Sequence, residues 1–374
     1  MVDLLRYEQG IYAFDAHYIR PQLAAIHLIV ENDQVAVVDT ANNAALPHAL
    51  DALRQLGLSP ANVAYVFLTH VHLDHAGGAG AMMQAFPEAR LVVHPRGARH
   101  MAEPAKLFAA VQAVYGEAEA RHLYGDPIPV SPDRILSAGE GFSFELGGRT
   151  LVCLDTPGHA RHHLALQDTR SGCLFTGDIF GLSFRELDVD GRPSIIPTTT
   201  PTQFEPEVMH ESVDRILACR SEALYLTHFS RIEDIARLSA DLHRLIDAHV
   251  AVAERERDAG PEREARILAG LWALMDAEAA RQGWTLPTEQ WRAVLNRHRT
   301  QRPGFGLLAG PGFELQVSHR RAASGFIPQR RAMVCRWPAV CSNLHRFIRE
   351  HRHLHRSVTA GKHTLAIVDR LNRP

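Results

Sequence analysis

The stretch Thr69-His70-Val71-His72-Leu73-Asp74-His75 gathers three imidazoles and a carboxylate into one short segment. It follows an apolar run at 63–68 that is rich in valine and aromatic residues, and three glycines come soon after it, at 77, 78 and 80. Such a run predicts a buried β-strand, and the glycines predict a turn before the next helix. The polar cluster is therefore expected on the loop that leaves the carboxyl end of a strand, the edge at which layered α/β proteins usually build their sites.

The spacing within this cluster indicates metal binding. His70 and His72 are two residues apart, so on an extended backbone they project to the same side and can hold one ion as neutral imidazoles at about 2 Å. Asp74 and His75 are adjacent, and they can aim together only where the chain turns. We therefore expect a second ion beside the first.

Two ions need more than four ligands, and three later apolar runs each end in a further candidate. His159 follows the run at 150–154, Asp178 follows the run at 173–175, and His228 follows the run at 223–226. The chain has 23 histidines, so a single one carries little weight. Seven residues that fit one layout predict a site with two metal ions.

In chain order and spacing, these seven residues resemble the complete ligand set of the metallo-β-lactamase superfamily, over about residues 7–230. The resemblance implies an α/β fold, the four-layer αββα sandwich. The chain looks most similar to the hydrolase branch that includes glyoxalase II and the lactonases, because antibiotic-degrading members lack the bridging carboxylate that Asp178 would supply. The resemblance further implies that Asp39 contacts the metal loop rather than the ions. The ligand roles that the resemblance implies are these: the first ion is held by His70, His72 and His159, the second by Asp74, His75 and His228, and Asp178 bridges the two.

The chemistry that this site implies is hydrolysis. Two ions that share one water lower its pKa toward neutrality, and the resulting metal-bridging hydroxide would attack the carbonyl of a small ester, lactone or thioester. Asp74 or Asp178 is the candidate to move the proton. Zinc suits this ligand set best, with iron or manganese as alternatives. The alternative function is that of a mononuclear iron oxidoreductase, similar to the persulfide dioxygenases that share this fold.

Four other histidines have no role in the predicted ligand set. His162 and His163 follow His159 closely and are not needed by the ligand set; we expect His163 to begin a strand and His162 to lie at most next to a ligand. His94 and His100 are expected to be structural or at the rim of the pocket.

Three regions are expected along the chain. Residues 1–230 would form the catalytic domain, with a helical insertion at 95–132 that serves as a lid or in dimerisation. Strands are expected to resume over 135–175, with a tight hairpin at Gly147-Gly148, and to supply the second half of the fold. A loop at 181–201 is either a pocket wall or a plain structural loop; the candidates for substrate contact on it and beside it are Phe180, Phe184 and Arg185. Residues 231–300 would form a helical appendage whose apolar face packs on the sandwich or against a second subunit. Its helices are expected at 232–258, around 268–280 and at 288–298.

The remaining residues, 301–374, hold twelve arginines and one lysine against three acidic residues. A basic tail can bind nucleic acid or anionic lipid. The absence of periodicity, with many Arg, His, Pro and Gly residues, also fits a GC-rich reading frame translated out of register, which is the interpretation we favour. The body is acidic and holds no recognisable nucleic-acid module, so we expect a small-molecule substrate and rank nucleic-acid processing third.

Composition sets the remaining expectations. The five cysteines form no CxxC pair, so neither a disulfide framework nor a structural zinc finger is indicated. The first residues do not have the pattern of a signal peptide, and no run of about twenty apolar residues occurs. We therefore expect a cytoplasmic protein without a membrane anchor, with a homodimer through the helical segments as one option.

Overall fold

The computed structural model describes residues 1–200 and 203–296. The predicted basic tail at 301–374 lies outside the described residues, as does the end of the last predicted helix. Among the described residues, no helix is both long and apolar enough to cross a membrane.

The first sheet has seven strands that follow one another in chain order. Its first four strands pair antiparallel, and the last four pair parallel, with the fourth common to both sets. The strands are β1 (Leu4–Arg6), β2 (Ile11–Asp15), β3 (Ala25–Glu31), β4 (Gln34–Val38), β5 (Val63–Phe67), β6 (Arg90–Val93) and β7 (Ile135–Ser137). The predicted apolar runs thus form strands, but the prediction that all strands from residue 135 belong to the second half is wrong: β7 pairs with β6 and completes the first sheet.

The second sheet has six strands in the order β13-β12-β11-β10-β9-β8. They are β8 (Ser143–Leu146), β9 (Arg149–Asp155), β10 (Leu164–Asp168), β11 (Leu174–Gly177), β12 (Leu224–Leu226) and β13 (Ser230–Ile232). The predicted tight hairpin joins β8 to β9 through Gly147 and Gly148, both with positive φ. β11 and β12 are parallel, and β9 runs in the same direction because β10 is antiparallel to both of its neighbours. The carboxyl ends of β9, β11 and β12 therefore meet at one edge.

Alternate side chains of the strands fill three separate cores, as the period of two requires. Val35 and Val37 of β4 point away from the second sheet into a core shared with helices, whereas Ala36 and Val38 belong to the core between the sheets. Phe175 joins the same inner core, and Leu174 joins a third core on the far face of the second sheet. Three cores separate four layers, so the four-layer sandwich is confirmed.

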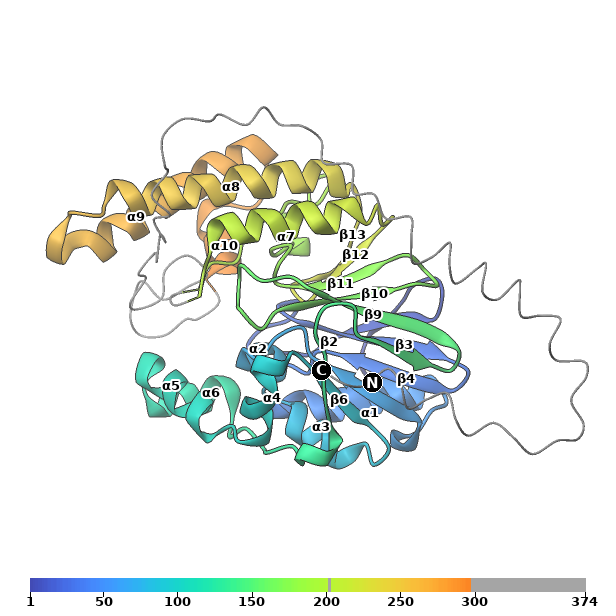
Figure 1. Ribbon diagram of the computed structural model, residues 1–374. Coiled ribbons are helices and arrows are strands. Elements are labelled where there is room, and N and C mark those ends of the chain that lie inside the picture. Colours follow the sequence, from blue (N-terminus) through green and yellow to red (C-terminus); the bar gives the residue numbers. More distant parts are fainter. Residues whose placement is uncertain (201–202, 297–374) are drawn as a thin grey trace, which may run out of the picture. The chain divides into compact units, whose positions relative to one another are not determined.

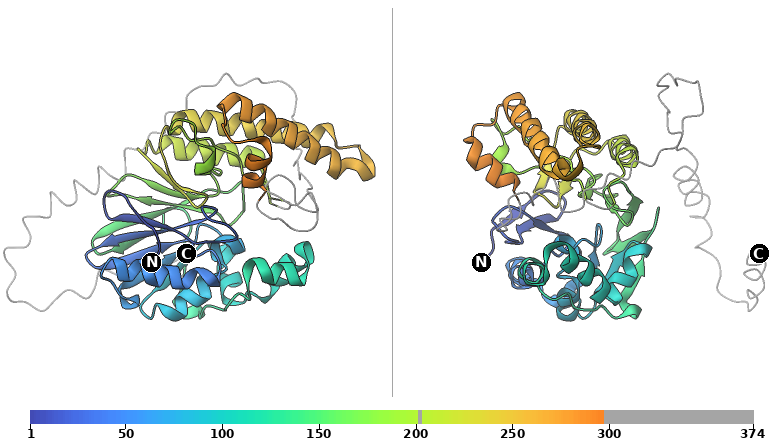
Figure 2. Two further views of the ribbon diagram at one scale, coloured as in Figure 1. Left: turned by 180° about the vertical axis from the view of Figure 1, so that it is seen from behind. Right: turned by 90° about the vertical axis from the view of Figure 1, so that its left-hand side faces the viewer.

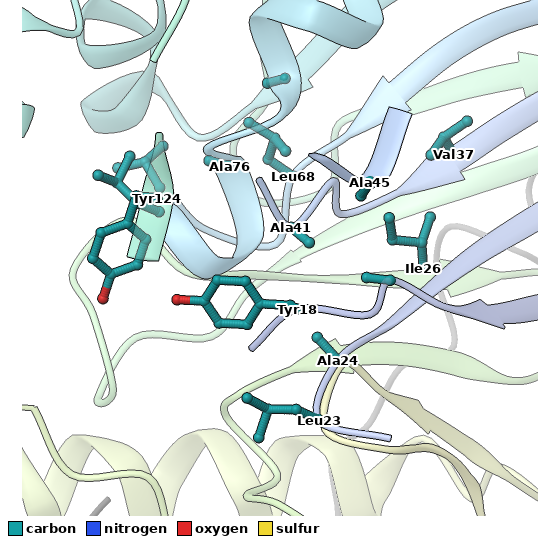
Figure 3. Packing of buried hydrophobic residues seen from close by; sticks show 14 of the residues in the cluster. Tyr18, Leu23, Ala24, Ile26, Val37, Ala41, Ala45, Leu68, Ala76 and Tyr124 are labelled. Atoms are coloured by element: carbon teal, nitrogen blue, oxygen red, sulfur yellow. The ribbon is translucent and has the colours of Figure 1, made fainter. Parts of the chain in front are cut away.

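Helices form the two outer layers (Figures 1 and 2). The first sheet is covered by α1 (Leu46–Gln55), α3 (Ala79–Ala85) and α4 (Pro95–Ala102). Figure 3 shows part of the core beneath them, where Ile26 and Val37 lie near Ala45, and the rings of Tyr18 and Tyr124 lie side by side, 6.3 Å apart. The predicted helical insertion consists of α4, α5 (Ala105–Tyr115) and α6 (Glu117–Tyr124).

The second sheet is covered by α7 (Pro206–Ala218) and α8 (Ile235–Arg255), whose residues Val213, Leu238 and Leu242 share its outer core. The apolar face of the first appendage helix is thus buried on the sandwich, one of the two expected alternatives. α9 (Arg263–Gln282) is longer than predicted and packs back along α8, and α10 (Thr288–Leu295) follows it. Trp291 of α10 lies against Trp272 and Trp284, which holds this helix to α9.

Candidate metal centre

The His70–His75 segment changes conformation between its two halves, as the spacing predicts. His72 still has an extended backbone (φ −65°, ψ 146°), and the short helix α2 (Leu73–Ala76) begins directly after it. The extended part presents His70 and His72 together, and the first turn of α2 brings Asp74 and His75 round to the same site. The parallel pairing of β5 with β4 and β6 places this loop at the carboxyl edge of the first sheet.

The other three residues reach the same place from the second sheet. His159 lies on the loop after β9, Asp178 directly follows β11, and His228 follows β12. Two main-chain hydrogen bonds join the sheets at this edge, from Leu164 N to Thr69 O (2.7 Å) and from Ala25 N to Thr227 O (2.8 Å). All seven predicted residues are therefore brought together by the structure.

Their donor atoms fall into overlapping groups of three. His72 Nδ1 lies 2.9 Å from His70 Nε2 and 3.1 Å from His159 Nε2, which makes one group of three imidazoles. Asp74, His75 and His228 form another, with Asp74 Oδ2 3.8 Å from His75 Nε2 and 3.6 Å from His228 Nε2. In each group the ligand atoms lie within 4.8 Å of one another.

Asp178 lies between these two groups. Its Oδ2 is 3.5 Å from His159 Nε2, whereas its Oδ1 is 3.3 Å from His75 Nε2 and 3.4 Å from His228 Nε2. One carboxylate thus directs one oxygen toward each group, the arrangement that a bridging ligand needs.

The donor set fits metal ions rather than an internal hydrogen-bond network. His75 Nε2 and Asp178 Oδ1 are buried 3.3 Å from each other, and neither has a partner in hydrogen-bond geometry within the described part of the chain. Two such atoms would be costly to bury unless something else satisfied them. The outward nitrogens, in contrast, are engaged: His75 Nδ1 contacts Asp39 Oδ2 (2.7 Å) and His228 Nδ1 contacts Leu23 O (2.6 Å). These contacts fix the tautomer that turns a lone pair on Nε2 inward, which is how ligating histidines are commonly held.

Asp39 ties together two segments that carry candidate ligands, the 69–75 loop and the turn at Thr227 and His228. Its Oδ1 accepts the Thr69 main-chain N–H (2.8 Å), and its Oδ2 accepts from His75 Nδ1 and from the hydroxyl of Thr227 (2.7 Å each). The residue is 1% exposed and has a φ of +57°, a left-handed conformation that aspartate tolerates better than most residues. The structure therefore places Asp39 behind the candidate ligands, where the resemblance expects it.

Burial and mutual charge shape the protonation of the site. Burial acts to lower the pKa of His75, but the carboxylates of Asp178, Asp39 and Asp74 outweigh it and raise this pKa well above its usual range. Burial also acts to raise the pKa of Asp178, but the imidazoles of His75 and His228 hold it well below its usual range. Burial lowers the pKa of His159 to about 3. His159 is therefore neutral and Asp178 is ionised, whereas His75 would have to release a proton on binding a metal ion.

His163 has a larger role at the site than the sequence suggested. It directly precedes β10 as expected, but its Nε2 accepts the main-chain N–H of Asp178 (3.2 Å), while its Nδ1 pairs with the Thr156 hydroxyl (2.9 Å). A side chain at the neighbouring Gly177 (φ +49°) would lie 2.8 Å from His163 Nε2. His163 therefore holds Asp178 in place. No local sequence pattern predicts this contact between strands.

The remaining candidates lie around the site or in the core. His162 accepts weakly from Val71 N (3.4 Å) and stacks at 6.2 Å on His70, so it is a neighbour of a ligand, as expected. His94 caps α4 and faces Asp155, in keeping with a structural role. Phe180 and Phe184 are at most 1% exposed, which favours the plain structural alternative for their loop over a pocket wall.

Known proteins share this fold and this ligand-bearing region. The profile of the metallo-beta-lactamase superfamily matches residues 20–228. A metallo-beta-lactamase fold-containing protein of Sulfurisphaera tokodaii is 25% identical over 227 residues, 59% of this chain and 78% of that protein. A solved structure of an archaeal superfamily protein from Sulfolobus tokodaii is similar with a TM-score of 0.50 and 22% identity, covering 64% of this chain and 86% of that one.

Two further relatives have names that describe an activity. A hydroxyacylglutathione hydrolase of Synechococcus is 28% identical over 151 residues (40% of this chain), and an acyl-coenzyme A thioesterase of Gallus gallus is 34% identical over 125 residues (30% of this chain). The chain spans less than half of each, 46% and 39% of their lengths. The superfamily profile covers more than half of this chain and ends on His228, the last of the seven converging residues, so the chain belongs to the metallo-beta-lactamase superfamily.

Proposed function

We propose that this protein is a hydrolase that holds two divalent metal ions and cleaves a small ester, lactone or thioester. The observation that carries the proposal is the position of Asp178, with one carboxylate oxygen toward the His70–His72–His159 group and the other toward the Asp74–His75–His228 group. A site for a single ion would not need the second group. The names of the hydroxyacylglutathione hydrolase and of the acyl-coenzyme A thioesterase support an acyl substrate.

The ions, of which zinc best suits imidazole-rich ligation, would supply Lewis acidity and a water of lowered pKa. Other residues of the chain hold the candidate ligands in position. Asp39 and Leu23 O hold the rings of His75 and His228, and His163 holds the main chain of Asp178.

The two carboxylates of the site differ in their access to solvent. The Asp74 side chain is 15% exposed, whereas that of Asp178 is 3% exposed. We therefore assign the exchange of a proton with solvent to Asp74 and the bridging position to Asp178.

The test combines metal analysis with turnover. Full-length protein loaded with zinc is screened against thioesters, lactones and aryl esters, and we expect two zinc ions per chain and hydrolysis of one class. His72→Ala and Asp178→Ala should each abolish turnover and lower the metal content. His162→Ala is the matched control, since this ring neighbours the ligands without belonging to either group, and it should keep both ions.

Two results would contradict the proposal. One iron per chain with oxygen uptake would support the oxidoreductase instead. Two ions retained by Asp178→Ala would rule out the bridge.

A further inference from the structure

We propose that Trp284, between α9 and α10, is a positioning residue for His228, and that the helical C-terminal part thereby sets the affinity of the second metal position. The inference rests on the metal-binding part of the proposed function and on none of its substrate chemistry. It follows from a chain of hydrogen bonds that leads from the indole of Trp284 to the main chain of His228.

The last link of this chain holds the backbone of His228. Ser183 N donates to His228 O (2.6 Å), and Phe229 N donates back to Ser183 O (3.2 Å). Ser183 is completely buried. The two bonds are made by the main chain on both sides, so the position of Ser183 fixes the peptide that carries the His228 ring.

The earlier links connect Ser183 to the helical part. The hydroxyl of Ser183 donates to Ser194 O (2.7 Å), and the indole Nε1–H of Trp284 donates to Ser194 Oγ (2.8 Å). Ser194 is 5% exposed; its bond with Ser183 is buried and its bond with Trp284 is partly buried, so competition from water at these bonds is reduced. Trp284 is thus joined to a metal-ligand peptide through two serines.

A second route from the helical part reaches the other side of His228. Arg20 donates to Val294 O in α10 (3.1 Å) and to Glu186 (2.6 Å), and its guanidinium lies 4.8 Å from the centre of the Phe184 ring. Arg20 belongs to the same β2–β3 loop as Leu23, whose carbonyl accepts from His228 Nδ1. Backbone and ring of this one ligand are therefore both braced by segments that α9 and α10 hold.

Among the hydrogen bonds described for residues 1–200 and 203–296, no unbroken chain leads from Trp284 to the first metal position, which meets the loop of Ser194 only at Thr198, further along that loop. His70 is held by Thr69 (3.1 Å), and His159 contacts the carbonyl of Thr198 (3.5 Å). The two positions of one molecule can therefore be compared: loss of the Trp284 hydrogen bond should weaken the second position and leave the first unchanged. General destabilisation would instead affect both.

The test is a zinc titration of full-length Trp284→Phe after removal of metal with a chelator. The equivalent that is lost in His228→Ala is assigned to the second metal position and is called the second equivalent. We expect the second equivalent to bind about fivefold more weakly than in the wild type, the scale of one neutral hydrogen bond, with the first equivalent unchanged. Cobalt in place of zinc should give an altered visible spectrum for the second equivalent only. The matched control is Trp272→Phe, which alters another ring of the same aromatic cluster, packed between Trp291 and Arg292, and should bind both equivalents normally.

A second variant tests the route itself. Ser194→Ala removes the acceptor of the Trp284 indole, so it should reproduce the effect, and the double variant should be no weaker than either single one. Normal binding of the second equivalent in both single variants would overturn the inference, and so would equal weakening of both equivalents. A wild type that binds fewer than two ions would instead contradict the proposed function, before any variant is compared.

Discussion

Asp39→Asn is the substitution that most directly probes how the site is held. It preserves shape but replaces one of two acceptor oxygens with an NH₂ group. Oδ1 receives the Thr69 N–H and Oδ2 receives His75 Nδ1 and the Thr227 hydroxyl, so in either orientation an amide donor must face a donor.

The less damaging orientation turns the NH₂ toward His75 and Thr227, because the Thr227 hydroxyl can rotate to accept. His75 can accept only if its proton moves from Nδ1 to Nε2, the nitrogen that faces the metal site. We therefore expect affinity at the second metal position to fall about 10- to 100-fold, the usual effect of losing a partner of a ligating histidine. Loss of a charged, buried hydrogen bond should also destabilise the metal-free protein by about 2 kcal/mol.

Two assays separate these effects. Urea unfolding in the presence of a chelator measures the stability of the metal-free protein, and zinc titration measures the loss of metal affinity at the second position. Asp33→Asn is a suitable control, because Asp33 lies in the hairpin that leads into β4, with a φ of +62°, and its side chain is exposed. If Asp39→Asn bound both ions as tightly as the wild type and unfolded at the same urea concentration, our account of how His75 is oriented would be wrong.

Three further substitutions test other parts of the structure. Gly158→Ala should cost about 3 kcal/mol or more and reduce zinc content, because its Cβ would lie 2.4 Å from Met209 Cα at a φ of +126°; normal urea unfolding would contradict this. Asp168→Ala strands the buried guanidinium of Arg149, so unfolding should show a loss of about 3–5 kcal/mol while the folded protein still binds two zinc ions. Burial lowers the pKa of His249 to about 4 from 6.5, so the unfolded chain takes up the proton first as the pH falls. Between pH 7 and pH 4 the chelator-treated wild type should therefore lose up to about 3 kcal/mol relative to His249→Leu; parallel curves for the two proteins would refute this.

Much of the fold and of the site was predictable, because both depend on local patterns. The strands are short runs of apolar residues between glycines and polar turns, and each of the seven site residues lies on the segment that follows such a run. Parallel strands bring their carboxyl ends to one edge, so residues far apart in sequence meet without any need to predict their contacts. The turn at Asp74 and His75 followed from the adjacency of two ligand-type residues.

The errors and omissions concern contacts between distant segments. β7 has three residues, and its partner could not be read from its own composition, since the helical insertion separates it from β6. His163 appeared redundant because its partner, the Asp178 main chain, carries no sequence signal. The indole of Trp284 reaches Ser194 across 90 positions of the chain, and neither residue type indicates the contact.

The bond between Asp39 and Thr227 closes a loop of 188 positions, so the site exists only after both sheets have come together. During synthesis the early histidines emerge long before their partners and can form only an incomplete, weak site. Under the proposed function, selection of the metal would thus be left to the finished protein, in which all seven candidate ligands are in place. Each ion that binds only this finished state would also stabilise the fold, by about 4 kcal/mol at a free ion concentration a thousandfold above its Kd.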